Sequence, residues 1–134
     1  MASEIPVVRS FQACLEVITD PGGTGVTLKT LVHAIVRLPG EPFPCIREEL
    51  ALYALLSNGR GEHAFAVELT RFDRGAETVV GRVGPVRIDL GQDPVIVHGL
   101  PIPLRNVVFK EAGQYAFYLR CDGQPLADVK IAVR

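Results

Sequence analysis

The chain has 134 residues, of which 48% are hydrophobic and 22% charged, and its formal net charge at pH 7 is −1. This length suits one domain, and the high apolar content excludes an intrinsically disordered chain. The 14 Lys and Arg residues are balanced by 15 Asp and Glu residues along the whole chain, so we expect no nucleic-acid partner. We predict a single domain over residues 1–134 and leave open whether residues 1–9 are a loose N-terminal segment.

The N-terminal residues carry no charged leader followed by an apolar run, so they do not predict a signal peptide. The longest uninterrupted apolar run, residues 51–56, is far too short for a membrane span. We therefore expect no membrane partner and a cytoplasmic location. The cysteines Cys14, Cys45 and Cys121 are odd in number and form no Cys-x-x-Cys motif, which predicts buried free thiols rather than disulfides.

The first predicted strand is residues 11–18, where apolar and more polar side chains alternate. Residues 19–25 are rich in glycine and are typical of a turn. Residues 26–38 and 47–57 each fit either a helix face or a strand by their periodicity. Residues 39–44 contain three prolines and end the preceding element, whether it is a helix or a strand.

Residues 22–30 resemble a phosphate-binding loop in part. That loop needs a glycine immediately before Lys-Thr, so that backbone N–H groups converge on the phosphate. Leu28 occupies this position, and the preceding Pro-Gly is typical of a hairpin turn. We therefore expect no nucleotide cofactor.

Residues 62–71 form a clear alternating pattern and predict a strand. Short extended pieces are expected at residues 78–83, 86–90 and 94–98, separated by Gly-Pro and Gly-Gln-Asp. Residues 99–104 cannot form a helix, because two prolines stand two positions apart. We expect this stretch to run extended along the edge of a sheet.

Two amphipathic strands, residues 115–121 and 127–133, close the chain around an Asp-Gly turn signal. A plain two-residue loop would place Asp128 on the same face as Phe117 and put a carboxylate in the core. An odd-length loop restores the apolar side chains to one face. We therefore predict such a loop, with a bulge at position 123 or 124.

The closing hairpin is expected to bury Phe117, Leu119, Val129 and Ile131 against a second layer. Tyr115 has two interpretations. It is either a corner tyrosine, whose hydroxyl bonds back to the backbone, or an ordinary aromatic side chain facing the core. Short strands separated by turn signals roughly every 8–12 residues predict an all-β, antiparallel, immunoglobulin-like sandwich of about seven strands.

Three motifs occur together: Pro-Phe-Pro at 42–44, Gly-Glu-His at 61–63, and Glu-Ala-Gly-Gln-Tyr-Ala-Phe-Tyr-Leu at 111–119, followed by Asp-Gly at 122–123. With them the chain resembles, from about residue 28 to its end, a family of small uncharacterised bacterial proteins predicted to be immunoglobulin-like sandwiches. The resemblance implies strands in both ambiguous segments, and we adopt that interpretation. It implies no catalytic residue.

The histidines His33, His63 and His98 are far apart and lack the spacing of metal ligands. We expect isolated histidines, no metal and no cofactor. The alternative is a small-ligand or metal-binding protein, including an enzyme, that uses His63, His98 and nearby acids such as Asp93. No serine stands in a nucleophile-elbow motif, and the paired carboxylates are adjacent in the chain, so we predict no catalytic residues and no enzyme.

The best candidate for binding is the apolar stretch Leu100, Pro101, Ile102, Pro103 and Leu104. On the surface it would form a docking patch, whereas in the interior it would plug one end of the sandwich. The chain has no Trp and only 7% aromatic residues, which argues against a carbohydrate-binding module. The leading hypothesis is a non-enzymatic interaction module or assembly subunit that uses exposed sheet edges for a protein partner or self-association.

Overall fold

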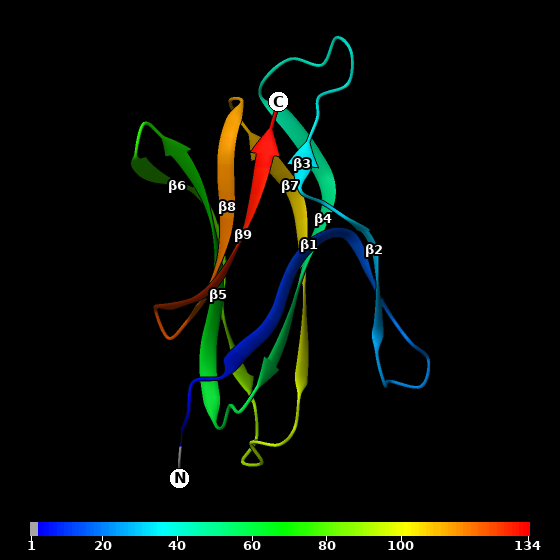
Figure 1. The fold of residues 1–134 in the computed structure, drawn as a ribbon, viewed down its shortest axis with the longest axis vertical. Helices are drawn as coiled ribbons and strands as arrows, with labels where there is room; N and C mark the ends of the chain where they lie inside the picture. Colours follow the sequence, from blue (N-terminus) through cyan, green and yellow to red (C-terminus); the bar gives the residue numbers. More distant parts are fainter. Residues whose placement is uncertain (1–2) are drawn as a thin grey trace.

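The computed structural model describes residues 3–134, and its regular elements are all β-strands (Figure 1). The strands are β1 (Val7–Thr19), β2 (Val26–Leu31), β3 (Ala34–Ile35), β4 (Cys45–Ser57), β5 (Glu62–Asp73), β6 (Ala76–Asp89), β7 (His98–Phe109), β8 (Gly113–Cys121) and β9 (Gln124–Val133). The expected count of about seven strands is therefore too low. No helix in the described range is long and apolar enough to cross a membrane.

The strands form two sheets, one with the order β2-β1-β4-β7 and one with the order β3-β9-β8-β5-β6. The pairings are antiparallel except that of β3 with β9, which is parallel and corrects the all-antiparallel expectation. The chain changes sheets just before β3. Val32 N still donates to Ala13 O in the first sheet (2.8 Å), whereas Ala132 N in the second sheet donates to His33 O (3.2 Å).

The two sheets share one hydrophobic core, because their inward-facing residues belong to a single cluster. The four-stranded sheet contributes Phe11, Leu52, Leu56, Leu104 and Phe109, and the five-stranded sheet contributes Phe65, Val67, Tyr115, Phe117, Leu119 and Ile131. Val129 is partly buried and packs against this cluster. The free thiols Cys14, Cys45 and Cys121 are all buried, as predicted.

The ambiguous segment 47–57 lies within β4, whereas the segment 26–38 contains β2 and the short β3, and its last three residues lie outside any strand. Residues 26–31 form β2, which pairs with β1 across the glycine-rich turn, so the stretch that resembles a phosphate loop is a hairpin. β4 lies between β1 and β7, and its alternate residues Leu50, Leu52, Ala54 and Leu56 are buried in the core, as expected for an antiparallel strand with one face on the core. The pieces predicted at 78–83 and 86–90 are one strand, β6, which continues through Gly84 and Pro85.

The closing hairpin corrects the predicted loop. Cys121 pairs with Gln124, so the loop has two residues rather than an odd number. Asp122 and Gly123 both have positive φ, of 50° and 82°, as a tight turn of the mirror-image type requires. A register shift further along the hairpin restores the apolar face, since the flanking pairs are Arg120–Pro125 and Leu119–Ala127 and leave Leu126 as the extra residue.

The N-terminal segment is held in place, in contrast to the loose segment considered from the sequence. β1 begins at Val7, and the backbone of Glu4 exchanges two hydrogen bonds with Arg60, of 3.1 and 3.0 Å. Residues 1–2 of the predicted segment lie outside the described residues.

Tyr115 is a corner tyrosine. Its hydroxyl donates a 2.7 Å hydrogen bond to the backbone oxygen of Glu111. Its ring is 1% exposed and meets Phe109 edge to face, with ring centroids 5.3 Å apart. Both interpretations of this residue are therefore correct, because the ring lies in the core while the hydroxyl stabilises the turn that leads into β8.

The variant Tyr115→Phe keeps the ring and removes only this hydrogen bond. We expect it to lower the free energy of unfolding by about 1 kcal/mol, because the hydrogen bond between the Tyr115 hydroxyl and the Glu111 carbonyl is lost. Urea unfolding measures this loss. Tyr118→Phe is the control, since the Tyr118 hydroxyl makes no hydrogen bond within residues 3–134 and should change little. Equal losses in the two variants would contradict the role of the Tyr115 hydroxyl.

Candidate functional site

An apolar groove lies between the edge strands β6 and β7. It consists of two adjoining pockets of about 260 and 300 Å³, which share Val67 and Val83 in their walls. Side chains of β6 line one wall, side chains of β7 line the other, and core residues of β5 and β8 form the floor. β6 and β7 are the edges of different sheets, so the groove marks the open seam between the two layers.

The predicted binding stretch lies in this groove. Leu100, Pro101, Ile102 and Pro103 line the larger pocket and Leu104 lines the smaller one. The stretch runs extended along a sheet edge within β7, as predicted. Leu104 is buried, Leu100 and Ile102 are half-buried, and the two prolines are exposed. The stretch is therefore one wall of a groove, neither an isolated patch nor a plug at one end of the core.

The two edges of the groove differ in their hydrogen-bonding capacity. Pro101 lies opposite Tyr53 and Pro103 lies opposite Ala51 in the β4–β7 ladder. In an antiparallel ladder, alternate residues direct their backbone groups either towards the neighbouring strand or away from it. Proline has no N–H, so Pro101 and Pro103 occupy positions that face away from β4. The open edge of β7 therefore lacks two N–H donors. The outer edge of β7 is consequently a poor template for another strand. β6 has no proline between Ala76 and Val83, so this part of its edge keeps its N–H donors, and Pro85 comes only after it.

Charge in the groove has one sign. Arg82 and Arg105 are the charged residues in the lining of the smaller pocket, and the lining of the larger pocket has none. Arg82 donates hydrogen bonds to Glu68 but its side chain is still 60% exposed. Arg105 forms no ion pair within the described part of the chain. The lining of the smaller pocket therefore carries two guanidinium groups and no carboxylate, and one of the two, that of Arg82, is paired with Glu68.

Glu68 is a buried carboxylate on β5, just outside the groove, and its side chain is 4% exposed. It accepts hydrogen bonds from Arg82 on β6 and from Arg120 on β8. These bonds from Arg82 and Arg120 hold the pKa of Glu68 below its ordinary value, against the opposing effect of burial. The ionised carboxylate therefore ties three neighbouring strands together.

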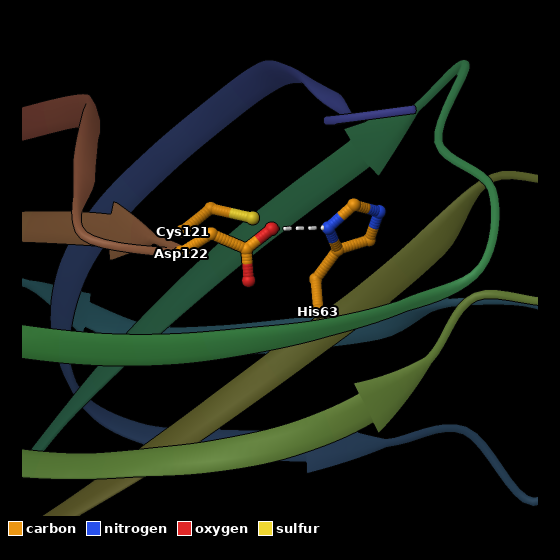
Figure 2. Close-up of side chains that lie close together, drawn as sticks. All are labelled: His63, Cys121 and Asp122. Atoms are coloured by element: carbon orange, nitrogen blue, oxygen red, sulfur yellow. Dashed lines mark hydrogen bonds and ion pairs between the residues drawn. The ribbon is translucent and has the colours of Figure 1, made fainter. Parts of the chain in front are cut away.

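A second cluster lies where β5 begins and β8 ends (Figure 2). His63 is buried, and its Nδ1 lies 2.7 Å from Oδ2 of Asp122. Its Nε2 lies 2.7 Å from the backbone oxygen of Arg60. A carbonyl oxygen can only accept, so Nε2 carries a hydrogen. The other Asp122 oxygen, Oδ1, accepts from the backbone N–H of Ala64 at 2.8 Å.

The electrostatics of this pair favour charge on both partners. Burial lowers the pKa of His63, but the hydrogen bonds to Asp122 and Arg60 outweigh it and leave the pKa raised. The Ala64 N–H, followed by His63, holds the pKa of Asp122 below its ordinary value. Burial raises the pKa of the neighbouring Cys121 thiol to about 11. The ligand atoms of His63, Cys121 and Asp122 all lie within 4.8 Å of one another.

The sequence identified His63 but not its neighbours. His98, its expected companion, begins β7 opposite Leu56, in the other sheet. Asp93 accepts a hydrogen bond from the Val95 N–H in a turn and is not part of the His63 cluster. Asp122 was interpreted only as a turn residue. The three residues come together because β5 pairs with β8, which places Phe65 opposite Cys121.

Comparisons with known proteins give a family but no activity. The model of a family of unknown function, DUF6941, matches residues 27–134. No curated protein matches the chain. Among solved structures, the chain is similar to a Pseudomonas fluorescens alkylpurine DNA glycosylase AlkC bound to DNA containing an abasic site analog, with 10% identity and a TM-score of 0.48. The match covers 92% of this chain but spans only 30% of that one, and at this TM-score it carries no argument.

Proposed function

The chain belongs to the DUF6941 family of unknown function, which brings no activity with it, and we propose that it is a non-enzymatic protein-binding module. Its site is the groove between β6 and β7, and its ligand is an extended segment of a partner protein. The observation that carries this proposal is an apolar groove with one strand edge open to pairing and the other blocked by prolines.

We further propose that the two sheets form an immunoglobulin-like sandwich and that the protein is bacterial, as the sequence resemblance implies. We also propose a cytoplasmic location, which was expected from the lack of a signal-peptide pattern. In this assignment β1, β4 and β7 correspond to strands A, B and E, and β5, β8 and β9 to strands C, F and G. The corner tyrosine at the start of β8 supports it, because such a tyrosine typically begins strand F. β6 then corresponds to strand C′, which extends the sheet of C, F and G.

Binding by strand addition suits this groove. A partner strand that pairs with the outer edge of β6 would satisfy its exposed backbone groups. Every second side chain of the added strand would point towards the pockets, which are lined by Val80, Val83, Ile102 and Leu104 among others. The seam between the sheets would then be covered, and exposed valines of β6 would be buried.

The charged residues of the groove indicate which side chains the partner segment carries. Arg82 and Arg105 favour a carboxylate beside the apolar side chains of the added strand, and no acidic residue of the groove opposes one. The lining also contains no Ser, Cys or His, which supports binding without catalysis. The proposed ligand is therefore an extended segment with alternating apolar residues and an adjacent acidic residue.

Selection from a displayed random-peptide library tests this ligand. We expect enrichment of alternating apolar peptides with an acidic residue. Val83→Arg, within the groove, should weaken the selected peptide at least tenfold in a fluorescence-anisotropy titration. Val95→Arg is the matched control, because Val95 is 81% exposed and lies outside both pockets. Peptides without the pattern, or equal affinity for both variants, would overturn the proposal.

Light scattering after size exclusion tests the other possible ligand of the groove, a second copy of the chain. We expect a monomer at high protein concentration, since two grooves facing each other would bring their Arg82 and Arg105 side chains together. A dimer that Val83→Arg dissociates would make the chain its own ligand and would overturn the acidic, apolar partner.

A further inference from the structure

We propose that His63, Cys121 and Asp122 form a binding site for a zinc ion, with one ligand atom from each side chain (Figure 2). This inference is independent of the proposed binding function, since none of the three residues lines the groove between β6 and β7.

The backbone brings the three side chains together from positions about 60 residues apart. Phe65 pairs with Cys121 in the β5–β8 ladder, which places the start of β5 beside the end of β8. The N–H of Asp122 donates to the oxygen of Ala64 at 2.8 Å and continues this contact into the turn. His63 and Cys121 therefore project from two paired strands and Asp122 from the turn that follows β8, which limits how far the three ligands can move apart.

The distances are close to those of a zinc site. Zinc binds nitrogen and oxygen at about 2.0–2.2 Å and sulfur at about 2.3 Å, so tetrahedral ligands lie about 3–4 Å from one another. The three ligand atoms here lie within 4.8 Å of one another, and Nδ1 and Oδ2 are 2.7 Å apart. Side-chain adjustments of about 1 Å would give the required geometry.

The surrounding hydrogen bonds already orient the ligands. A metal-binding histidine usually donates its other ring N–H to a backbone carbonyl or carboxylate, and His63 Nε2 lies 2.7 Å from the Arg60 oxygen. This contact leaves Nδ1 as the coordinating atom. The Ala64 N–H fixes Oδ1 of Asp122 and leaves Oδ2 directed at Nδ1. The proton now between Nδ1 and Oδ2 lies where the ion would bind.

The chemistry of the three ligands selects zinc. An imidazole nitrogen, a thiolate and a carboxylate suit a borderline-soft ion, whereas calcium and magnesium prefer oxygen ligands only. Binding would displace the Nδ1 proton and the thiol proton of Cys121, so affinity should increase with pH. Three protein ligands leave a fourth position for water, on the side where Asp122 is 43% exposed.

The test uses tag-free protein and zinc alone, titrated against a chromophoric chelator. We expect one zinc ion per chain and a raised melting temperature on zinc addition. Cys121→Ala should weaken zinc binding more than 100-fold, because loss of an indirect partner alone typically costs about 10- to 100-fold. Cobalt should give a thiolate charge-transfer band in the near ultraviolet with the unmodified chain but not with Cys121→Ala.

Cys14→Ala is the matched control, because Cys14 is also a buried free thiol but lies in β1, away from the cluster. It should bind zinc and cobalt as the unmodified chain does. Circular dichroism of both variants without metal establishes that each is folded. Failure of the folded, unmodified chain to bind one zinc ion, or equal affinity in the two variants, would overturn the site and leave His63 and Asp122 as a proton-bridged pair.

Discussion

Replacing Phe109 by Ala should lower the free energy of unfolding by about 4 kcal/mol, the largest loss we expect from one side chain. Phe109 is fully buried at the end of β7, opposite Cys45 of β4. Its ring contacts Tyr115 of the other sheet edge to face. Truncation would therefore remove both a large apolar side chain and an aromatic contact between the sheets. The ladder between β7 and β4 limits how far the backbone can move to close the resulting cavity.

Urea unfolding at neutral pH measures this loss, with Phe72→Ala as the control. Phe72 is of the same residue type but is only half-buried at the end of β5, so its truncation should cost less than half as much. A loss below about 2 kcal/mol for Phe109→Ala, or equal losses in the two variants, would show that this ring does not hold the sheets together.

Replacing Glu68 by Gln should lower the free energy of unfolding at pH 7 by about 2 kcal/mol, because hydrogen bonds to a charged group are worth about 1.5–3 kcal/mol. The substitution would place an uncharged amide between the guanidinium groups of Arg82 and Arg120, which now donate to the carboxylate. The charge attraction that joins β5 to both of its neighbours would be lost.

The effect should depend on pH in a definite direction. The pKa of Glu68 is lower in the folded chain than in the unfolded chain, because Arg82 and Arg120 stabilise the ionised carboxylate. Its contribution is therefore present above the unfolded pKa of about 4.3 and is lost as pH falls through the lower, folded pKa. The difference between the unmodified chain and Glu68→Gln should be largest at neutral pH and should shrink below about pH 4.

Urea unfolding at pH 7 and at pH 3 tests both statements. Glu62→Gln is the control, since Glu62 is on the same strand but forms an exposed ion pair with Arg87, and exposed pairs contribute little. A Glu68→Gln deficit that stays constant between the two pH values would contradict an ionised carboxylate, as would a deficit no larger than that of Glu62→Gln.

Periodicity was a sound guide where strands have one buried face. It predicted the strand from residue 62 to 71 and the apolar faces of β8 and β9, because each of these strands packs one apolar face on the core. The two prolines of residues 99–104, rather than periodicity, predicted that this stretch runs extended at a sheet edge. The central strand β4 stayed ambiguous, because Ala51, Tyr53 and Leu55 on its outer face are also apolar and remove the alternation that distinguishes a strand from a helix.

The remaining features depend on contacts that no local pattern contains. The parallel pairing of β3 with β9 arises where the chain changes sheets, and only two residues take part. The bulge at Leu126 depends on the tight turn at Asp122 and Gly123, which both adopt positive φ. The groove needs β6 and β7 to end different sheets on the same side, and the contact of His63 with Asp122 spans 59 residues.

The three buried thiols provide a built-in way to follow how the molecule opens. Cys14, Cys45 and Cys121 lie in β1, β4 and β8 and are therefore divided between the two sheets. An alkylating reagent reaches such a sulfur only after its strand has separated from its neighbours, so labelling rates translate into local opening free energies. Mass spectrometry of single-cysteine variants would thus distinguish layers that come apart separately from layers that come apart in one cooperative step.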